Sequence, residues 1–177
     1  MGQARQQWIG VLCGLGAALL IPAACSESVS DPSDPIAPAV VADAPRLLTC
    51  APARPVSARG LVGRAGGRLM MAGHTMSLPV SAVRNGTSFT MTVPASRLVE
   101  VNIKANGREK FAFDEPVTIS ISYARCAPDE VPEEGLTVWK VGPRTKVPLK
   151  PMGGVQDPVA RTVTFVTDSL SSYAIAN

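Results

Sequence analysis

The chain has 177 residues, with 17 Lys and Arg against 14 Asp and Glu and one histidine, which gives a net charge of +3 at pH 7. This basic excess is small and dispersed, so the composition excludes the clustered basic surface of a nucleic-acid-binding protein. One histidine and four cysteines leave little material for a His- or Cys-ligated metal site, and we expect neither a metal nor another cofactor.

Residues 1–24 have the pattern of a secretory signal peptide. Arg5 is the only charge, and an apolar run of 14 residues extends from Trp8 to Ile21. A helix that crosses a hydrocarbon core needs about 20 residues, so this run is predicted to be a cleaved leader rather than a membrane span.

Cys25 follows the leader and has two interpretations. Ala24-Cys25 resembles a bacterial lipobox, in which the cysteine is acylated and becomes the new N-terminus, although Pro22 stands where that pattern usually has an aliphatic residue. Alternatively, an ordinary signal peptidase cuts nearby and Cys25 remains a free thiol. The polar segment that follows favours the lipobox, and two acyl chains give stable anchoring. We therefore expect an extracytoplasmic bacterial lipoprotein, on the outer membrane if there are two membranes, because Ser26 rather than Asp follows the cysteine.

Residues 25–57 are predicted to be a tether. The segment is rich in Ser, Asp, Pro and Ala, and such a composition has too little apolar surface to form a core.

Cys50 and Cys126 form an even pair once Cys25 is acylated. In an oxidising compartment this favours a disulfide, which closes a loop of about 77 residues; two separate buried thiols are the alternative. We expect the disulfide to hold the end of the tether on the main domain.

Residues 58–177 are predicted to form one antiparallel β-sandwich of eight or nine short strands. Apolar and polar residues alternate with a period of two in 88–93, 99–104 and 117–124. Shorter strand-like runs occur in 163–165 and 173–175. Asn85-Gly86 and Asn106-Gly107 lie between these runs and favour tight hairpin turns.

The same 120 residues resemble the ZU-type domain of zonula occludens scaffolds, netrin receptors and ankyrins. The glycine-rich turn in 62–69 resembles the opening motif of that domain. The F-x-x-P-V-T-I strand of the family is matched by Phe113-Asp114-Glu115-Pro116-Val117-Thr118-Ile119, and its closing strand is matched by residues 171–176. The resemblance implies a β-sandwich used for packing and interaction, without a characteristic reaction.

Some members of that family cleave themselves at a His-Phe-Ser motif before the last strand. The matching positions here are Ser169-Leu170-Ser171, where Ser171 stands for the nucleophile and Ser169 replaces the histidine. A serine is a poor proton acceptor, and Asp168 lies on a strand next to Ser169 and points to the other face. We expect no self-cleavage and no catalytic residues.

Three other features have simple structural interpretations. His74 is expected at an exposed hairpin tip and Trp139 in the core. Asp129, Glu130, Glu133 and Glu134 form an acidic cluster that lacks the ligand spacing of a Ca²⁺ loop and is expected to be a solvated connection.

The sequence therefore predicts a lipid-anchored, non-enzymatic β-sandwich for protein–protein interaction or structural support, possible partners being other envelope or surface proteins. A glycan- or peptide-binding adhesive module is the alternative, and a self-processing domain comes third. The oligomeric state is left open.

Overall fold

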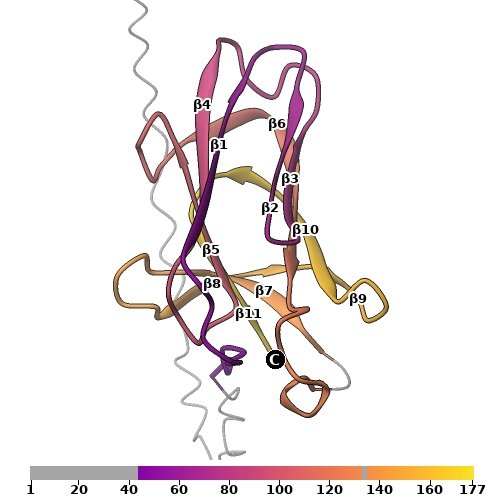
Figure 1. Ribbon diagram of the computed structural model, residues 1–177. Coiled ribbons are helices and arrows are strands. Elements are labelled where there is room, and N and C mark those ends of the chain that lie inside the picture. Colours follow the sequence, from indigo (N-terminus) through magenta and orange to yellow (C-terminus); the bar gives the residue numbers. More distant parts are fainter. Residues whose placement is uncertain (1–43, 133–134) are drawn as a thin grey trace, which may run out of the picture. The chain divides into compact units, whose positions relative to one another are not determined.

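A computed structural model describes residues 44–132 and 135–177. The predicted leader, Cys25 and the tether up to residue 43 lie outside these ranges, as do Glu133 and Glu134. The described residues form two antiparallel sheets, so the prediction of an all-β sandwich is confirmed (Figure 1). Their only helical element is a 3₁₀ turn, Pro128–Glu130, and none of their helices is long and apolar enough to cross a membrane.

One sheet has six strands, and it lies on the left in Figure 1. Its order is β1 (Val56–Val62), β4 (Thr87–Val93), β5 (Glu100–Ala105), β11 (Ser172–Ala176), β7 (Thr137–Val141) and β8 (Pro148–Gly153).

The other sheet has five strands and lies on the right. Its order is β2 (Gly67–Met71), β3 (His74–Leu78), β6 (Ala112–Ser122), β10 (Thr162–Ser169) and β9 (Val155–Asp157). β1 passes into β2, and β3 into β4, by crossing from one sheet to the other, and these connections lie together at the upper end of the sandwich.

The core lies between the sheets and is formed by the alternating residues that the sequence pattern assigns to it. On β6, Val117, Ile119 and Ile121 are fully buried. Phe89 and Met91 of β4 are buried as well, and Phe89 packs against Phe113 with the ring centroids 5.8 Å apart. Because successive side chains of a strand point to opposite faces, the period of two is enough to select this face.

Two strands were missed by the sequence pattern, which explains why eleven are found and not eight or nine. β8 contains Pro148 and Pro151, and β9 has only three residues. Both are edge strands, and an edge strand tolerates proline because one row of its backbone groups pairs with no other strand.

The two Asn-Gly pairs behave differently. Asn106 and Gly107 both have positive φ and form the expected tight turn, closed by a bridge between Ala105 and Arg108. The prediction for Asn85-Gly86 is wrong, because neither residue has positive φ and the segment connects β3 and β4, which belong to different sheets.

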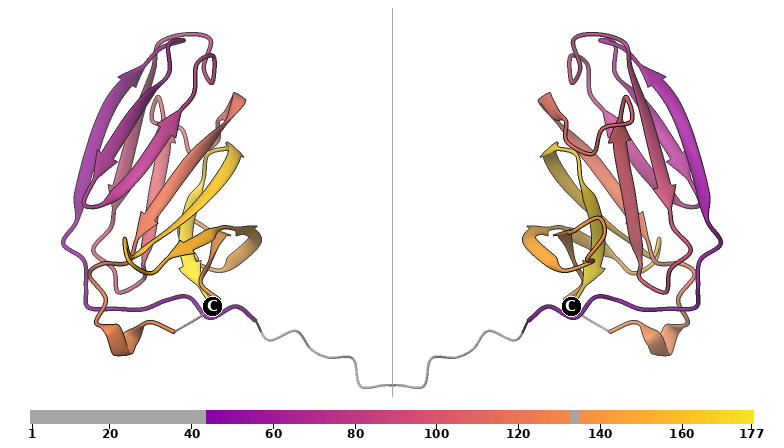
Figure 2. Two further views of the ribbon diagram at one scale, coloured as in Figure 1. Left: turned by 90° about the vertical axis from the view of Figure 1, so that its right-hand side faces the viewer. Right: turned by 90° about the vertical axis from the view of Figure 1, so that its left-hand side faces the viewer.

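Ordered structure begins ahead of residue 58. Leu47 bridges Ala176 and Thr49 bridges Leu98, so residues 46–50 run beside β11 and the start of β5. Arg46 and Asn177 also exchange two backbone hydrogen bonds, so the described chain begins and ends at the same end of the sandwich (Figure 2).

Candidate binding sites

The predicted disulfide between Cys50 and Cys126 is present. It joins the segment before β1 to the chain after β6, across 76 positions of sequence. The neighbouring Arg125 reinforces this connection, since its guanidinium donates to the carbonyl oxygens of Ala51 and Leu98, the second over 2.7 Å. The expected role of Cys50, to hold the N-terminal segment on the sandwich, follows from this geometry.

His74 is buried, with 6% of its surface exposed, so the prediction of an exposed hairpin tip is wrong. The tip is formed by Ala72 and Gly73, both with positive φ, and His74 is the first residue of β3. The φ of Gly73, +83°, is unfavourable for other residues, and a Cβ there would lie in tight contact, 3.1 Å, with the side chain of Ser122. The tight turn therefore brings His74 against the end of β6.

The imidazole of His74 is held in one tautomer. Its Nδ1 accepts a hydrogen bond of 3.2 Å from the backbone N–H of Ser122, so the ring proton of the neutral form lies on Nε2. Burial, and then the positive charge of Arg125, lower the pKa of His74 from 6.5 to about 4. The ring is therefore neutral at pH 7 and offers one N–H donor.

A pocket of about 300 Å³ opens beside His74. Its wall is mainly apolar and combines residues from the segment before β1, the β2–β3 turn and the ends of β4 and β6. The apolar contributors include Pro52, Val56, Ala72, Val93 and Ala124. The polar side chains are His74, Ser122, Arg54 and Arg125, and no acidic residue lines it. The sequence pattern missed this site because its members come from four separate segments.

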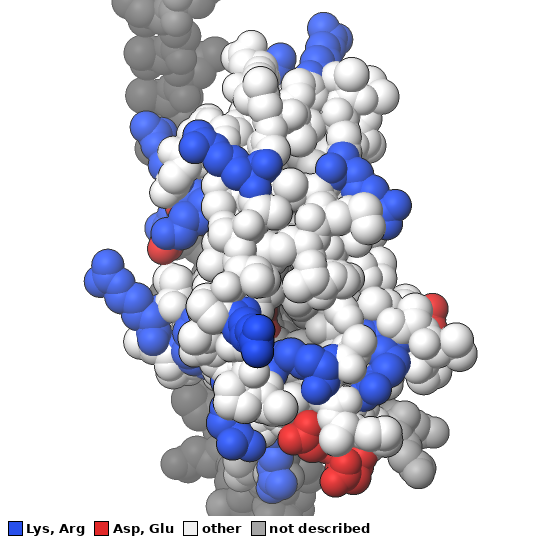
Figure 3. Space-filling model, in the orientation of Figure 1, with Lys and Arg blue, Asp and Glu red and all other residues white. Residues whose placement is uncertain are grey.

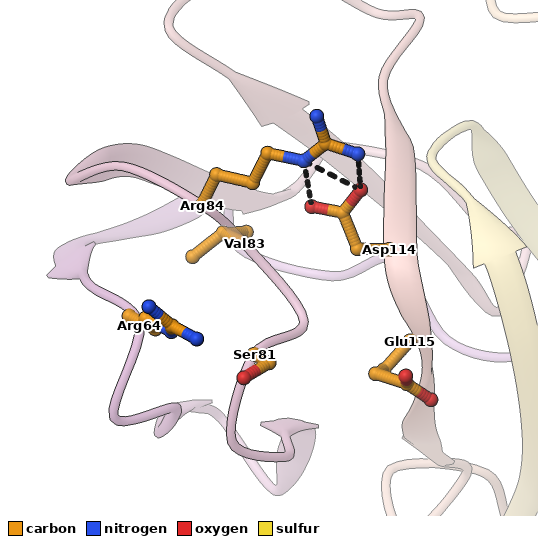
Figure 4. A pocket seen from close by; sticks show the side chains of 6 residues that line it. All are labelled: Arg64, Ser81, Val83, Arg84, Asp114 and Glu115. Carbon is orange, nitrogen blue, oxygen red and sulfur yellow. Dashed lines mark hydrogen bonds and ion pairs between the residues drawn. The ribbon is translucent and has the colours of Figure 1, made fainter.

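A second, charged pocket of about 450 Å³ lies where Arg64, Ser81 and Arg84 of the connecting loops meet Asp114 and Glu115 of β6 (Figure 4). The guanidinium of Arg84 faces the carboxylate of Asp114, with Nη2 to Oδ1 at 3.0 Å. Arg84 is 84% exposed, and an ion pair this exposed contributes little. Two basic and two acidic residues leave the lining without a net charge to select a ligand.

The outer face of the five-stranded sheet carries few charges. The register aligns Met70, Thr75, Ser120, Thr164 and Val155 in one row across five strands. Met70 and Val155 are 60% and 74% exposed, and Thr164 donates to Ser120 over 3.0 Å. In the next row, Arg68, Ser77, Thr118 and Val166 follow one another. We call these two rows the hydroxyl face.

The outer face of the six-stranded sheet contains a buried ion pair that sequence analysis missed. Glu100 occupies a polar position of the alternating run 99–104, where an outward and exposed side chain is expected, yet it is 1% exposed and pairs with Lys146. Lys146 comes from the β7–β8 loop, which therefore reaches over β5 at this position. Oε1 of Glu100 and Oδ1 of Asn102, two residues along the same face, have no hydrogen-bond partner among the described residues.

The candidate self-cleavage residues are not assembled into a catalytic group. Ser169 ends β10, its carbonyl oxygen accepts from the hydroxyl of Tyr173, and Leu170 is buried. Ser171 lines a small pocket with Asn102 and Pro143. His74 lines a different pocket, so the structure does not bring the histidine and this serine together.

The structure also places two residues of the acidic cluster, Asp129 and Glu130, and the tryptophan Trp139. Asp129 and Glu130 lie on the 3₁₀ turn, where Glu130 accepts from the N–H of Ala127 over 2.8 Å. Trp139 is only partly buried, because its neighbour Val138 takes the inward position on β7. The prediction that Trp139 belongs to the core is therefore wrong. The rings of Phe89, Phe113, Tyr123, Phe165 and Tyr173 are buried, and Phe111 is partly buried.

Within residues 44–132 and 135–177, no three His, Cys, Asp or Glu side chains are grouped as a metal site requires. No family model matches the chain, and no curated protein is significantly similar to it.

Proposed function

We propose that the protein is a bacterial envelope lipoprotein that carries a non-catalytic, ZU-type β-sandwich and binds another envelope or surface protein. The antiparallel sandwich supports the resemblance to that domain. The disulfide supports an oxidising, extracytoplasmic compartment, since such bonds are rare in proteins of the cytoplasm. Acylated Cys25 anchors the protein to the membrane.

The hydroxyl face is the observation that carries the interaction. The two rows contain one charged residue, Arg68, and depletion of charge is typical of the centre of a protein interface. Met70, Val155 and Val166 are all more than half exposed, around a centre of threonine and serine. Such a surface is suited to a flat protein partner.

Glycan binding is less well supported. A sugar platform generally uses exposed aromatic rings, and among the described aromatic residues only Phe111 and Trp139 are not buried, each only partly exposed. Figure 3 shows Lys and Arg dispersed over one face of the sandwich, without the single basic patch that a nucleic acid requires.

Site-specific photocrosslinking in cells tests the interaction. A photoreactive amino acid at Thr118, in the middle of the hydroxyl face, is expected to form a discrete adduct with another envelope protein. The matched position is Thr90, an outward threonine on a strand of the other sheet, where no adduct is expected. Equal adducts at both positions, or adducts only at Thr90, exclude the hydroxyl face as the interface.

Metabolic labelling with a radioactive fatty acid tests the anchor. The substitution Cys25→Ser is expected to abolish the label and release the protein from the membrane fraction. Cys13→Ser is the matched control, because Cys13 lies in the leader and is removed with it. Full membrane retention and labelling of Cys25→Ser contradict the anchor, independently of the crosslinking result.

A further inference from the structure

The pocket beside His74 combines three features that together select a ligand. The first is the free donor. Nδ1 of His74 is occupied by Ser122, so Nε2 carries the proton, and no described residue accepts a hydrogen bond from it. His74 is more than nine-tenths buried and lines the pocket. This N–H is therefore available to donate a hydrogen bond to a ligand in the pocket.

The second feature is charge. Arg54 lines the pocket and forms no ion pair with another described residue, while Arg125 is fixed nearby by the backbone carbonyls of Ala51, Arg97 and Leu98. No acidic side chain balances these two cations in the lining. Residues 44–177 also hold 16 Lys and Arg against 10 Asp and Glu, so the field of the whole domain favours an anion.

The third feature is the apolar wall. Pro52, Val56, Val93 and Ala124 provide hydrocarbon surface, and a volume of about 300 Å³ accommodates only a small molecule. The site is rigid at its base, because the disulfide and the Arg125 hydrogen bonds hold the segment before β1 against the end of β6. The pocket is thus preformed, which lowers the entropic cost of binding.

We propose that this pocket binds a small monocarboxylate with a short branched apolar tail. The tail lies against the apolar wall, one carboxylate oxygen accepts from Nε2 of His74, and Arg54 supplies the opposite charge at the mouth. This proposal is independent of the anchor and of the hydroxyl face. No covalent step is involved, and the occupant is a free acid rather than the C-terminus of a peptide.

Titration of the ¹⁵N-labelled mature chain carrying Cys25→Ser, followed by NMR, tests the proposal. The probe is 3-methylbutanoate, and the matched probes are 3-methyl-1-butanol and 3-methylbutylamine, which share its tail. Saturable shifts of the His74 ring and the Ser122 amide are expected for the acid, with affinity at least roughly tenfold weaker for the alcohol and the amine. Equal shifts for all three probes, or none, overturn the proposal, as does binding of a peptide with a C-terminal Leu at least as tightly as the free acid.

Three variants complete the test. His74→Phe keeps a ring and removes the donor, and Arg54→Gln removes the charge at an exposed position where folding is not at risk. Each is expected to weaken binding of the acid roughly tenfold. Arg84→Gln, in the charged pocket, is the control and is expected to leave binding unchanged. Unchanged affinity in folded Arg54→Gln overturns the proposal even if His74→Phe fails to fold.

Discussion

The backbone N–H of Ser122 donates to Nδ1 of His74 across 48 positions of sequence. Protonation of this nitrogen removes the acceptor, and it places a positive charge in a buried site next to Arg125. Protonation of His74 is therefore less favourable in the folded state than in the unfolded chain. The unfolded chain binds it near pH 6.5, while the folded protein binds it only near its own pKa of about 4.

The free energy of unfolding is accordingly expected to fall as the pH is lowered. The unfolded state binds more protons between these two values, so the contribution of His74 is complete above about pH 6.5 and is lost toward pH 4, amounting to about 3 kcal/mol. Urea unfolding followed by the fluorescence of Trp139 at several pH values measures this. His74→Phe removes the titrating group, so its profile is expected to be flatter by the same amount; an equally steep profile contradicts the prediction.

Loss of the disulfide is expected to reduce stability substantially. Cys50→Ala combined with Cys126→Ala frees a loop of about 77 residues in the unfolded chain, which corresponds to about 4 kcal/mol in the chain-entropy treatment. Urea unfolding of the double variant measures the loss. In the wild type, alkylation under denaturing, non-reducing conditions is expected to leave both cysteines unmodified. Alkylation of either one shows that the bond has not formed.

Removal of Lys146 is expected to destabilise the fold far more than removal of a surface lysine. Lys146→Met leaves the buried carboxylate of Glu100 without its counter-charge, which costs about 3 kcal/mol. Lys104→Met is the control, because its pairing with Glu109 is exposed and contributes at most about 1 kcal/mol. Adding Glu100→Gln to Lys146→Met is expected to recover part of the loss. Strict additivity in this double-mutant cycle contradicts a direct interaction.

The mature chain is expected to remain a single polypeptide. Ser171 has no histidine beside it, and Leu170 is buried, with its N–H bonded to the carbonyl oxygen of Phe111 over 2.8 Å. Intact-mass spectrometry of the purified protein checks this. Two fragments divided between Leu170 and Ser171 contradict it, and their loss on Ser171→Ala identifies the nucleophile.

The sheets and the core could be read from the sequence because strand alternation is a local property. Phe89, Met91, Val117 and Ile119 are apolar at every second position, and each is buried as the pattern predicts. The edge strands β8 and β9 could not be read, since edge strands tolerate proline and need no buried face of their own.

The candidate site was largely beyond sequence reasoning. The pattern places Glu100 correctly on the outer side of its strand, but it does not reveal that Lys146 comes over it from a loop 46 positions away. Likewise His74 was read as part of a turn, because nothing local indicates that the turn closes on Ser122. Burial of an outward side chain depends on which distant segment covers it.

The sequence by itself determined the class of fold and the buried face of the central strands, because the period of two is a local property of each strand. It favoured the pairing of Cys50 with Cys126, and the tertiary structure decided between a disulfide and two separate thiols. Tertiary structure alone decided that His74 is a buried neutral donor in an apolar pocket and that Glu100 is a buried carboxylate. Both properties arise from desolvation, and desolvation depends on long-range packing that no local pattern encodes.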